Sequence, residues 1–293
     1  MSARQKFTPQ QISALRHVHR RRHQPKGISA MVRVRNEEEF LYPAIRSIVD
    51  HVEEIAIFDN RSDDRTPEIS RQLATEYPRK VCLHEYPHRL RKIGHEYWVH
   101  SRRADQLSSC NLSANFYNWC LARCSQPYIL KWDGDMLACQ VFYEGLQAWR
   151  RSRAQILVIY GVNVHPDKRH LLAAKRSSRE ELTAELSVPG MPSWVTWLTY
   201  DFPEPRLFSR HQAHYDSSLG WTQKLRSPFL DEPLTARYVQ VLEKHSFLHL
   251  KFLKSDPLAA YSQDLADLIR ANVTRGPLLD EQDWNLLARW QIA

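Results

Sequence analysis

The stretch YILKWDGD, residues 128–135, decides the fold that we predict for this chain. Residues 128–132 form a mostly apolar run, typical of a strand buried inside a sheet. Two carboxylates, Asp133 and Asp135, follow this run with only Gly134 between them. Open α/β sheets bind ligands beyond the carboxyl ends of their strands, so the acidic pair predicts a ligand site at a strand end.

In two earlier segments an apolar run is likewise followed by a polar residue. Residues 28–34 and 54–58 are apolar runs; Asn36 follows the first, and the second stops at Asp59. Asn36 is predicted to cap a helix that begins at Glu37. The alternation of strands and helices along the chain predicts an α/β fold with a mixed, mostly parallel sheet flanked by helices. We therefore expect the three strand-end loops to form the rim of one site.

The chain divides into three predicted parts. Residues 1–26 form a basic helical leader with the run RHVHRRRH, and residues 256–293 form a C-terminal helical extension. Residues 27–255 form the α/β domain between them, in two halves, 27–136 and 137–255.

Composition excludes several classes of protein. The chain has 293 residues, 43% of them hydrophobic, which is enough to bury a core. Its 8 glycines include no glycine-rich phosphate loop, and its 5 cysteines include no C-x-x-C pair. No apolar run is long enough to cross a membrane, and no secretion signal is present. These features predict a cytoplasmic protein.

The basic balance of the chain points to an anionic partner. The formal net charge is +8, with a pI near 9.3. Nucleic acid, anionic lipid and a phosphorylated substrate all suit such a surface, and a solvated helix face is the plain alternative. The carboxylates at the strand ends narrow this choice. Together they can hold a divalent ion, Mn²⁺ or Mg²⁺, and the ion can bridge the phosphates of a nucleotide diphosphate.

Residues 28–66 resemble the opening of the family-2 glycosyltransferases, which have the GT-A (Rossmann-like) fold. The family's first strand runs into Asn-Glu-Glu, matched by Asn36-Glu37-Glu38. Its second strand ends in an Asp-rich loop, matched by residues 59–66, DNRSDDRT. Asn118 matches the family's helix Asn by its spacing before the D-x-D motif. The resemblance implies transfer of a sugar from a nucleotide-diphosphate sugar, with Mn²⁺ or Mg²⁺ as cofactor.

The resemblance makes residues 27–255 the catalytic domain, with a nucleotide-binding half over 27–136 and an acceptor half over 137–255. It also implies which residues form the site. Those expected to bind the nucleotide sugar are Arg33, Arg35, Asn36, Glu37, Asp59, Asn60, Arg61, Asp64, Asn118, Asp133 and Gly134. The expected metal ligands are Asp133, Asp135 and His249, since a C-terminal histidine often completes this site in the family. Lys251 could add positive charge for phosphate.

The catalytic base is the least defined part of the site. Members that invert the anomeric centre use a carboxylate to remove the proton of the acceptor hydroxyl during direct displacement. Glu232 ranks first as this base because it lies 17 residues before His249, and Asp216 ranks second. Either one taken alone is the kind of carboxylate common on protein surfaces.

The acceptor is expected to be a glycan or a lipid-linked molecule of the bacterial surface-polysaccharide type. The aromatic residues Trp194, Trp197 and Tyr200 could stack on an acceptor sugar, although core packing explains them equally well. The basic leader suggests peripheral contact with an anionic membrane at its inner face.

Two other functions fit part of the sequence. A nucleotidyltransferase of related fold would share the strand-end carboxylates, but it usually has a glycine-rich loop after its first strand. A noncatalytic protein that binds nucleic acid or an anionic surface would explain the basic leader but not the carboxylates. We therefore expect no nucleic acid partner.

Overall fold

The computed structural model describes residues 26–101, 103–174, 200–210, 213–216, 222–225 and 239–293. The predicted leader helix, the predicted base Glu232 and the tryptophans of the aromatic segment lie outside these residues.

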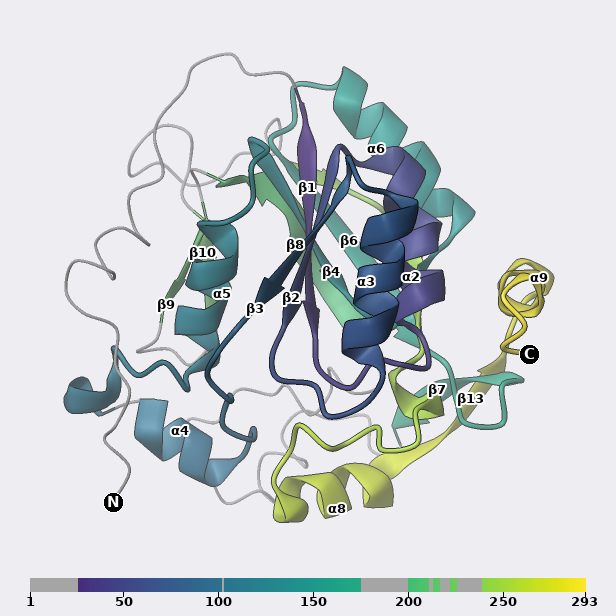
Figure 1. Ribbon diagram of the computed structural model, residues 1–293. Coiled ribbons are helices and arrows are strands. Elements are labelled where there is room, and N and C mark those ends of the chain that lie inside the picture. Colours follow the sequence, from purple (N-terminus) through teal and green to yellow (C-terminus); the bar gives the residue numbers. More distant parts are fainter. Residues whose placement is uncertain (1–25, 102, 175–199, 211–212, 217–221, 226–238) are drawn as a thin grey trace.

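A nine-stranded mixed sheet forms the centre of the fold (Figure 1). Its order is β3-β2-β1-β4-β8-β6-β12-β5, with β11 also paired to β6. Five of the strand pairs are parallel, and the β4–β8, β8–β6 and β12–β5 pairs are antiparallel. The strands are β1 (Ile28–Val34), β2 (Glu54–Asp59), β3 (Val81–Glu85), β4 (Tyr128–Asp133), β5 (Met136–Ala138), β6 (Ile156–Asn163), β8 (Tyr200–Ser209), β11 (Val239–Val241) and β12 (Phe247–His249). The predicted mixed, mostly parallel α/β sheet is confirmed.

Helices cover both faces of this sheet. On one face lie α2 (Leu41–Ile48), α3 (Thr66–Glu76) and α6 (Gln140–Arg151), and on the other lies α5 (Ser113–Leu121) (Figure 1). Each face has its own apolar core. The first includes Ile45 of α2 and Trp149 of α6, and the second includes Phe116 of α5 packed against the strands. Strands buried on both sides in this way are apolar along most of their length. This is why the sequence alone predicted β1, β2 and β4.

The first helix starts later than the sequence predicts. Asn36 does not cap a helix at Glu37, because its backbone is left-handed, with φ of 56°. Residues 38–40 form a turn instead, and α2 begins at Leu41 with Pro43 in its first turn, where a missing N–H costs little. The Glu37 N–H donates to Thr66 Oγ1 at 2.7 Å, so tertiary contacts fix the turn.

The short strands β5 and β12 carry the D-x-D segment. β4 ends at Asp133, and after Gly134 and Asp135 the chain enters β5 at once. β12 pairs antiparallel with β5, which sets His249 opposite Met136. The backbone N–H of Leu250 donates to the carbonyl of Asp135 at 2.8 Å. A segment more than 100 residues away in sequence is therefore fixed beside the acidic motif.

The C-terminal part contains a strand as well as helices. It consists of α8 (Gln263–Asn272), β13 (Val273–Leu278) and α9 (Glu281–Arg289). β13 pairs antiparallel with β7 (His170–Ala174), away from the main sheet. β9 (Ala213–Asp216) and β10 (Thr222–Leu225) form a separate hairpin, and α4 (His95–Ser101) lies near α8 in Figure 1. None of the helices that the structure describes has the length and apolarity to cross a bilayer.

Candidate functional site

A cavity of about 290 Å³ opens at the carboxyl ends of β1 and β4. Three acidic and five basic side chains line it together with a histidine. They are Glu37, Asp133, Asp135, Arg33, Arg35, Arg91, Lys92, Lys251 and His249. Eight residues predicted from sequence thus meet at one cavity: Arg33, Arg35, Glu37, Asn60, Asp133, Asp135, His249 and Lys251. The excess of basic side chains gives the cavity a positive balance suited to phosphate.

Two arginines hold the first acid of the motif. The Arg33 guanidinium pairs with Asp133 Oδ1, and Arg206 Nη1 lies 3.1 Å from Asp133 Oδ2. Although burial opposes ionisation, these two cations hold the pKa of Asp133 well below its usual range. Arg33 also stacks on Tyr117, with its guanidinium carbon 4.2 Å from the ring centre. Asp133 is therefore a fixed, ionised carboxylate.

The second acid is bonded to a lysine and a histidine. Asp135 Oδ2 lies 2.5 Å from Lys254 Nζ, and Asp135 Oδ1 lies 3.0 Å from His249 Nε2. The Asp135 side chain is only 4% exposed. Burial opposes its ionisation, but Lys254 and His249 hold the pKa of Asp135 well below its usual range. The predicted closeness of His249 to the motif is present in the structure.

Lys254 also joins Asp135 to Glu37. Lys254 Nζ lies 2.8 and 3.0 Å from the two carboxylate oxygens of Glu37. One ammonium thus serves two buried carboxylates, and burial together with the charge of Asp135 raises the pKa of Glu37 to about 8. A Cβ on Gly134 would lie 2.9 Å from Glu37 Cγ. Gly134, which was expected to bind the nucleotide sugar, therefore makes room for the Glu37 side chain.

Several other predicted residues hold two strand-end loops together. Asn36 Oδ1 accepts from the Asp63 N–H at 2.8 Å. Asp64 accepts from the N–H groups of Glu38 and Thr66, at 3.0 and 2.9 Å. These bonds fasten the loop after β1 to the loop after β2. The residues that match the family motif at Asn36 and Asp64 thus shape the rim of the cavity.

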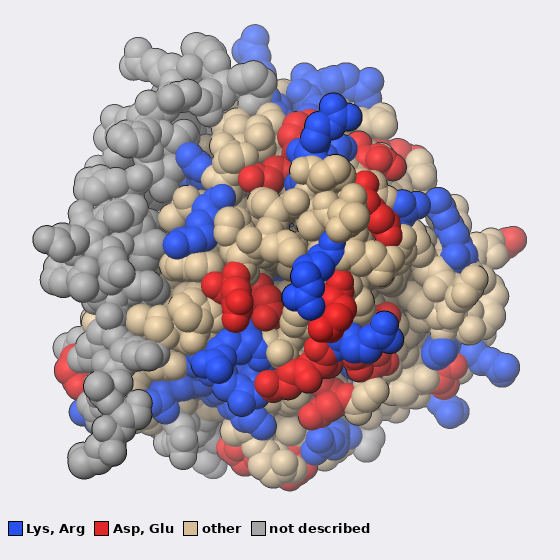
Figure 2. All heavy atoms as spheres, in the orientation of Figure 1, with Lys and Arg blue, Asp and Glu red and all other residues tan. Residues whose placement is uncertain are grey.

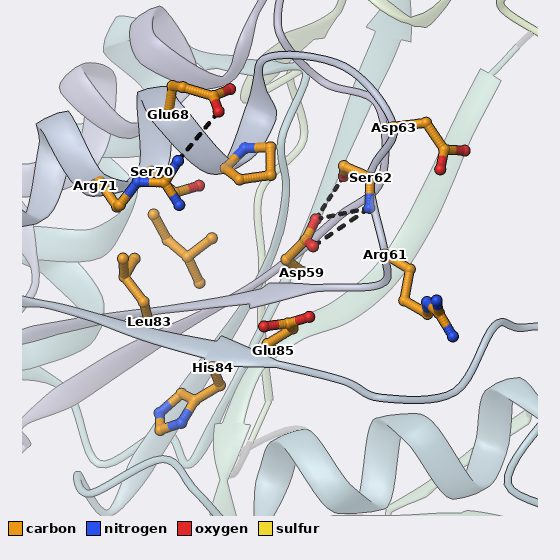
Figure 3. Close-up of a pocket in the computed structure, with 12 residues that line it drawn as sticks. Asp59, Arg61, Ser62, Asp63, Glu68, Ser70, Arg71, Leu83, His84 and Glu85 are labelled. Atoms are coloured by element: carbon orange, nitrogen blue, oxygen red, sulfur yellow. Dashed lines mark hydrogen bonds and ion pairs between the residues drawn. The ribbon is translucent and has the colours of Figure 1, made fainter.

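The loop after β2 also lines a second cavity, of about 540 Å³ (Figure 3). Asp59 and Arg61 line it and do not line the cavity around Asp133. In Figure 3 the Asp59 carboxylate faces Ser62, whose N–H it accepts at 3.3 Å, and Glu85 of the neighbouring strand lies close by. Asn60 lines the cavity around Asp133 instead, and its side-chain amide donates to the His88 carbonyl at 2.6 Å.

Asn118 has a structural role. Its side-chain amide donates to the Tyr215 carbonyl at 2.7 Å and accepts from the Tyr215 N–H at 2.9 Å. These two bonds fasten α5 to β9, and Asn118 does not line the cavity around Asp133. Of the two predicted bases, Asp216 is the last residue of β9, and the structure describes only its backbone. Glu232 lies outside the described residues.

The predicted metal ligands do not converge in this arrangement. Asp133 is paired with two arginines, and one oxygen of Asp135 is taken by Lys254. In the described part of the chain, Asp133, Asp135 and His249 are not a group whose ligand atoms lie within 4.8 Å of one another. Because protein cations already neutralise both carboxylates, these three residues as placed do not fit a divalent ion.

Sequence reasoning missed Arg206 and Lys254. Arg206 directly precedes the apolar residues Leu207 and Phe208 of a buried strand. A basic residue in such a strand needs an acidic partner, and this signal was available from the sequence. Lys254 follows His249 across a 3-10 turn (Lys251–Leu253), and nothing local shows that it reaches back to Asp135.

Charges of both signs gather around this region. In the orientation of Figure 1, Lys and Arg side chains lie beside Asp and Glu side chains below the centre of the molecule (Figure 2). At the lower left of this view Lys and Arg side chains form a contiguous cluster, and acidic side chains lie beside it.

The comparisons with known proteins agree with the resemblance seen in the sequence. The sequence profile of Glycosyl transferase family 2 matches residues 29–94, which is less than half of the chain. No curated protein sequence matches the chain.

Several solved structures are similar to parts of the fold. The S. aureus TarS fragment 1–349 has a TM-score of 0.44 and 12% identity, over 77% of this chain and 60% of that one. The same fragment in complex with UDP has a TM-score of 0.43 and 11% identity, over 84% and 64%. Mannosyltransferase PcManGT from Pyrobaculum calidifontis, in complex with GDP-Man and Mn²⁺, has a TM-score of 0.33 and 17% identity, over 47% and 36%. The chain thus spans about 60% of the length of the TarS fragment, and likenesses this weak carry no functional argument.

Proposed function

We propose that the protein transfers a sugar from a nucleotide-diphosphate sugar to an acceptor hydroxyl. The observation that carries this proposal is the cavity at the ends of β1 and β4, which we call the donor cavity and in which basic side chains surround Asp133 and Asp135. The family-2 match over residues 29–94 supports it, because it includes two of the three strand-end loops, those after β1 and β2.

The basic residues of the cavity are suited to the diphosphate. Lys251, Arg91 and Lys92 line it without being the partners of Asp133 or Asp135. Charge develops on the leaving diphosphate as the sugar departs, and fixed cations there stabilise the transition state. Arg33 and Arg206 keep Asp133 in place as an acceptor for hydroxyl groups of the donor.

We further propose an inverting displacement with a carboxylate base, Glu232 or Asp216. General base catalysis contributes typically about 10²–10⁴-fold, so the base accounts for only part of the rate. The acceptor class that we propose is a glycan or lipid-linked molecule of a surface polysaccharide. If the basic leader meets a membrane, deleting residues 1–26 will reduce flotation with anionic liposomes.

Metal dependence, with Mn²⁺ or Mg²⁺, is the part of the prediction with the least support from the geometry. A divalent ion on Asp135 would have to displace Lys254 from the oxygen that it holds at 2.5 Å. We derive no catalytic step through such an ion. The cations of the protein itself supply the positive charge in the mechanism proposed above.

A thermal-shift screen tests the proposed function. UDP, GDP, CMP and dTDP sugars are added singly, with Mn²⁺ or with a chelator. We expect one nucleotide to raise the Tm, and Lys251→Met to reduce this shift while the exposed Lys244→Met retains it. The active nucleotide sugar is then incubated with candidate acceptors; release of the nucleoside diphosphate indicates glycosyl transfer. No shift from any nucleotide sugar would refute the proposal, and pyrophosphate release from a nucleoside triphosphate would indicate nucleotidyl transfer instead.

A further inference from the structure

Three residues outside the donor cavity form a second cluster of potential ligands. They are Cys139, His245 and Asp283, and their ligand atoms all lie within 4.8 Å of one another. His245 Nε2 lies 3.0 Å from Asp283 Oδ1, and Cys139 Sγ lies 3.9 Å from the same oxygen. No other three His, Cys, Asp or Glu side chains in the described part of the chain meet in this way.

Each of the three comes from a different segment. Cys139 is the N-cap residue of α6, directly after β5. His245 lies in the turn before β12, and Asp283 is in the first turn of α9. The Cys139 N–H donates to the Ser246 carbonyl at 2.9 Å, which fixes the first two segments against each other. The cluster thus joins the C-terminal helix to the edge of the main sheet.

The charge of Asp283 is not balanced by a permanent cation. Its side chain is 5% exposed, and its carboxylate contacts the imidazole of His245 and the thiol of Cys139. Among the described residues, no lysine or arginine forms an ion pair with it. A buried carboxylate without a cation is costly, so the cluster is suited to receive positive charge.

We propose that Cys139, His245 and Asp283 bind one Zn²⁺ ion. Sulfur, imidazole nitrogen and carboxylate oxygen are the three ligand types that zinc uses in proteins. Bond lengths of about 2.0–2.3 Å place tetrahedral ligands about 3.3–3.6 Å apart. The observed separations of 3.0 and 3.9 Å bracket this range, so small side-chain shifts suffice. A cysteine ligand favours zinc over magnesium or calcium.

A water molecule or another small ligand completes the coordination. The three residues line a cavity of about 510 Å³, and the His245 side chain is 26% exposed. The fourth position therefore faces solvent. Because its ligands are far apart in sequence, the ion would stabilise the fold by tying α9 to β5 and α6.

The zinc content of the full-length protein tests the proposal without using transferase activity. The protein is purified with zinc in the medium, desalted, and analysed by atomic emission. We expect one zinc ion per chain, and its loss in Cys139→Ser and in Asp283→Asn. The matched controls are Cys82→Ser, which removes a half-buried thiol bonded to Glu54, and Asp135→Asn in the donor cavity; both should keep the metal.

Two further measurements exclude a simple folding failure. Adding zinc to chelator-treated wild-type protein at about 100 times the dissociation constant should raise the Tm by about 5 °C. Replacement with Co²⁺ should give the visible absorption of a four-coordinate ion and a thiolate charge-transfer band, and both should be absent from Cys139→Ser. No retained zinc and no Tm shift would show that the cluster is only a hydrogen-bonded group. Zinc retained in both variants would place the metal elsewhere.

Discussion

Asp135 and Asp283 are matched in burial and in their histidine partner, yet they differ in their second partner. Their residues are 3% and 4% exposed, and in each case a histidine Nε2 lies 3.0 Å from Oδ1. Asp135 has in addition the ammonium of Lys254 at 2.5 Å, whereas Asp283 has the thiol of Cys139 at 3.9 Å. The lysine supplies a permanent charge, and the thiol can supply only a ligand. The difference explains why we expect a metal at Asp283 and a metal-free phosphate site beside Asp135.

The largest expected effect comes from removing that lysine. Lys254→Met leaves Asp135 and Glu37 buried without their shared cation, and we expect the free energy of unfolding to fall by about 3–5 kcal/mol. Urea denaturation measures it, with the exposed Lys244→Met as control. If Mn²⁺ then stabilises Lys254→Met but not the wild type, the lysine is what excludes a divalent ion from Asp135. A loss as small as that of the control would remove the basis of the comparison.

The next effect concerns Glu37 and pH. The pKa of Glu37 in the folded protein is about 8, against 4.5 for an unperturbed glutamate side chain. Between these values the folded protein holds a proton that the unfolded chain has released, so this group makes stability fall as pH rises from about 4.5 to about 8. Glu37→Gln cannot titrate. Its free energy of unfolding relative to wild type should therefore improve by about 4 kcal/mol as the pH rises from 4.5 to 8. A pH-independent difference in urea denaturation would contradict this assignment.

A smaller effect is expected on ligand binding. Lys251 lines the donor cavity, and its loss removes one charge-assisted contact to phosphate. We expect Lys251→Met to weaken nucleotide-sugar binding about tenfold, with a chelator present throughout. Isothermal titration calorimetry with the nucleotide found in the screen measures this, again against Lys244→Met. If the chelator alone abolishes binding in the wild type, the site beside Asp135 needs a metal after all.

The smallest effect should be that of Asp283→Asn in metal-free protein. The thiol of Cys139 and a neutral His245 keep most of their contacts, so we expect a loss of about 1 kcal/mol in the free energy of unfolding. Denaturation in the presence of a chelator measures this loss. With zinc restored, the difference between wild type and Asp283→Asn should widen, because only the wild type gains from binding the ion. An unchanged difference would sink the zinc proposal.

Three strands of the central sheet, β1, β2 and β4, were predictable to within a residue or two. They are short, mostly apolar runs that end in polar residues, and each pairs in parallel with a neighbour. Local composition decides such strands because both faces are buried. The start of α2 was misread for the opposite reason: the bonds that shape residues 36–39 come from the loop after β2, which local capping signals do not reveal.

The sequence by itself determined the α/β class of this protein, the strands that end at Asp59 and Asp133, and the acidic motif at the edge of the sheet. These features depend on apolar runs and on neighbours only a few residues away. The tertiary structure alone decided which cations balance which carboxylates. Arg206 reaches Asp133 through the antiparallel pairing of β8, Lys254 reaches Asp135 through the turn after β12, and Asp283 meets Cys139 only because α9 packs beside β5. Such contacts join residues about 70 to 140 positions apart. Patterns of neighbouring residues along the chain do not reveal which distant residues will meet.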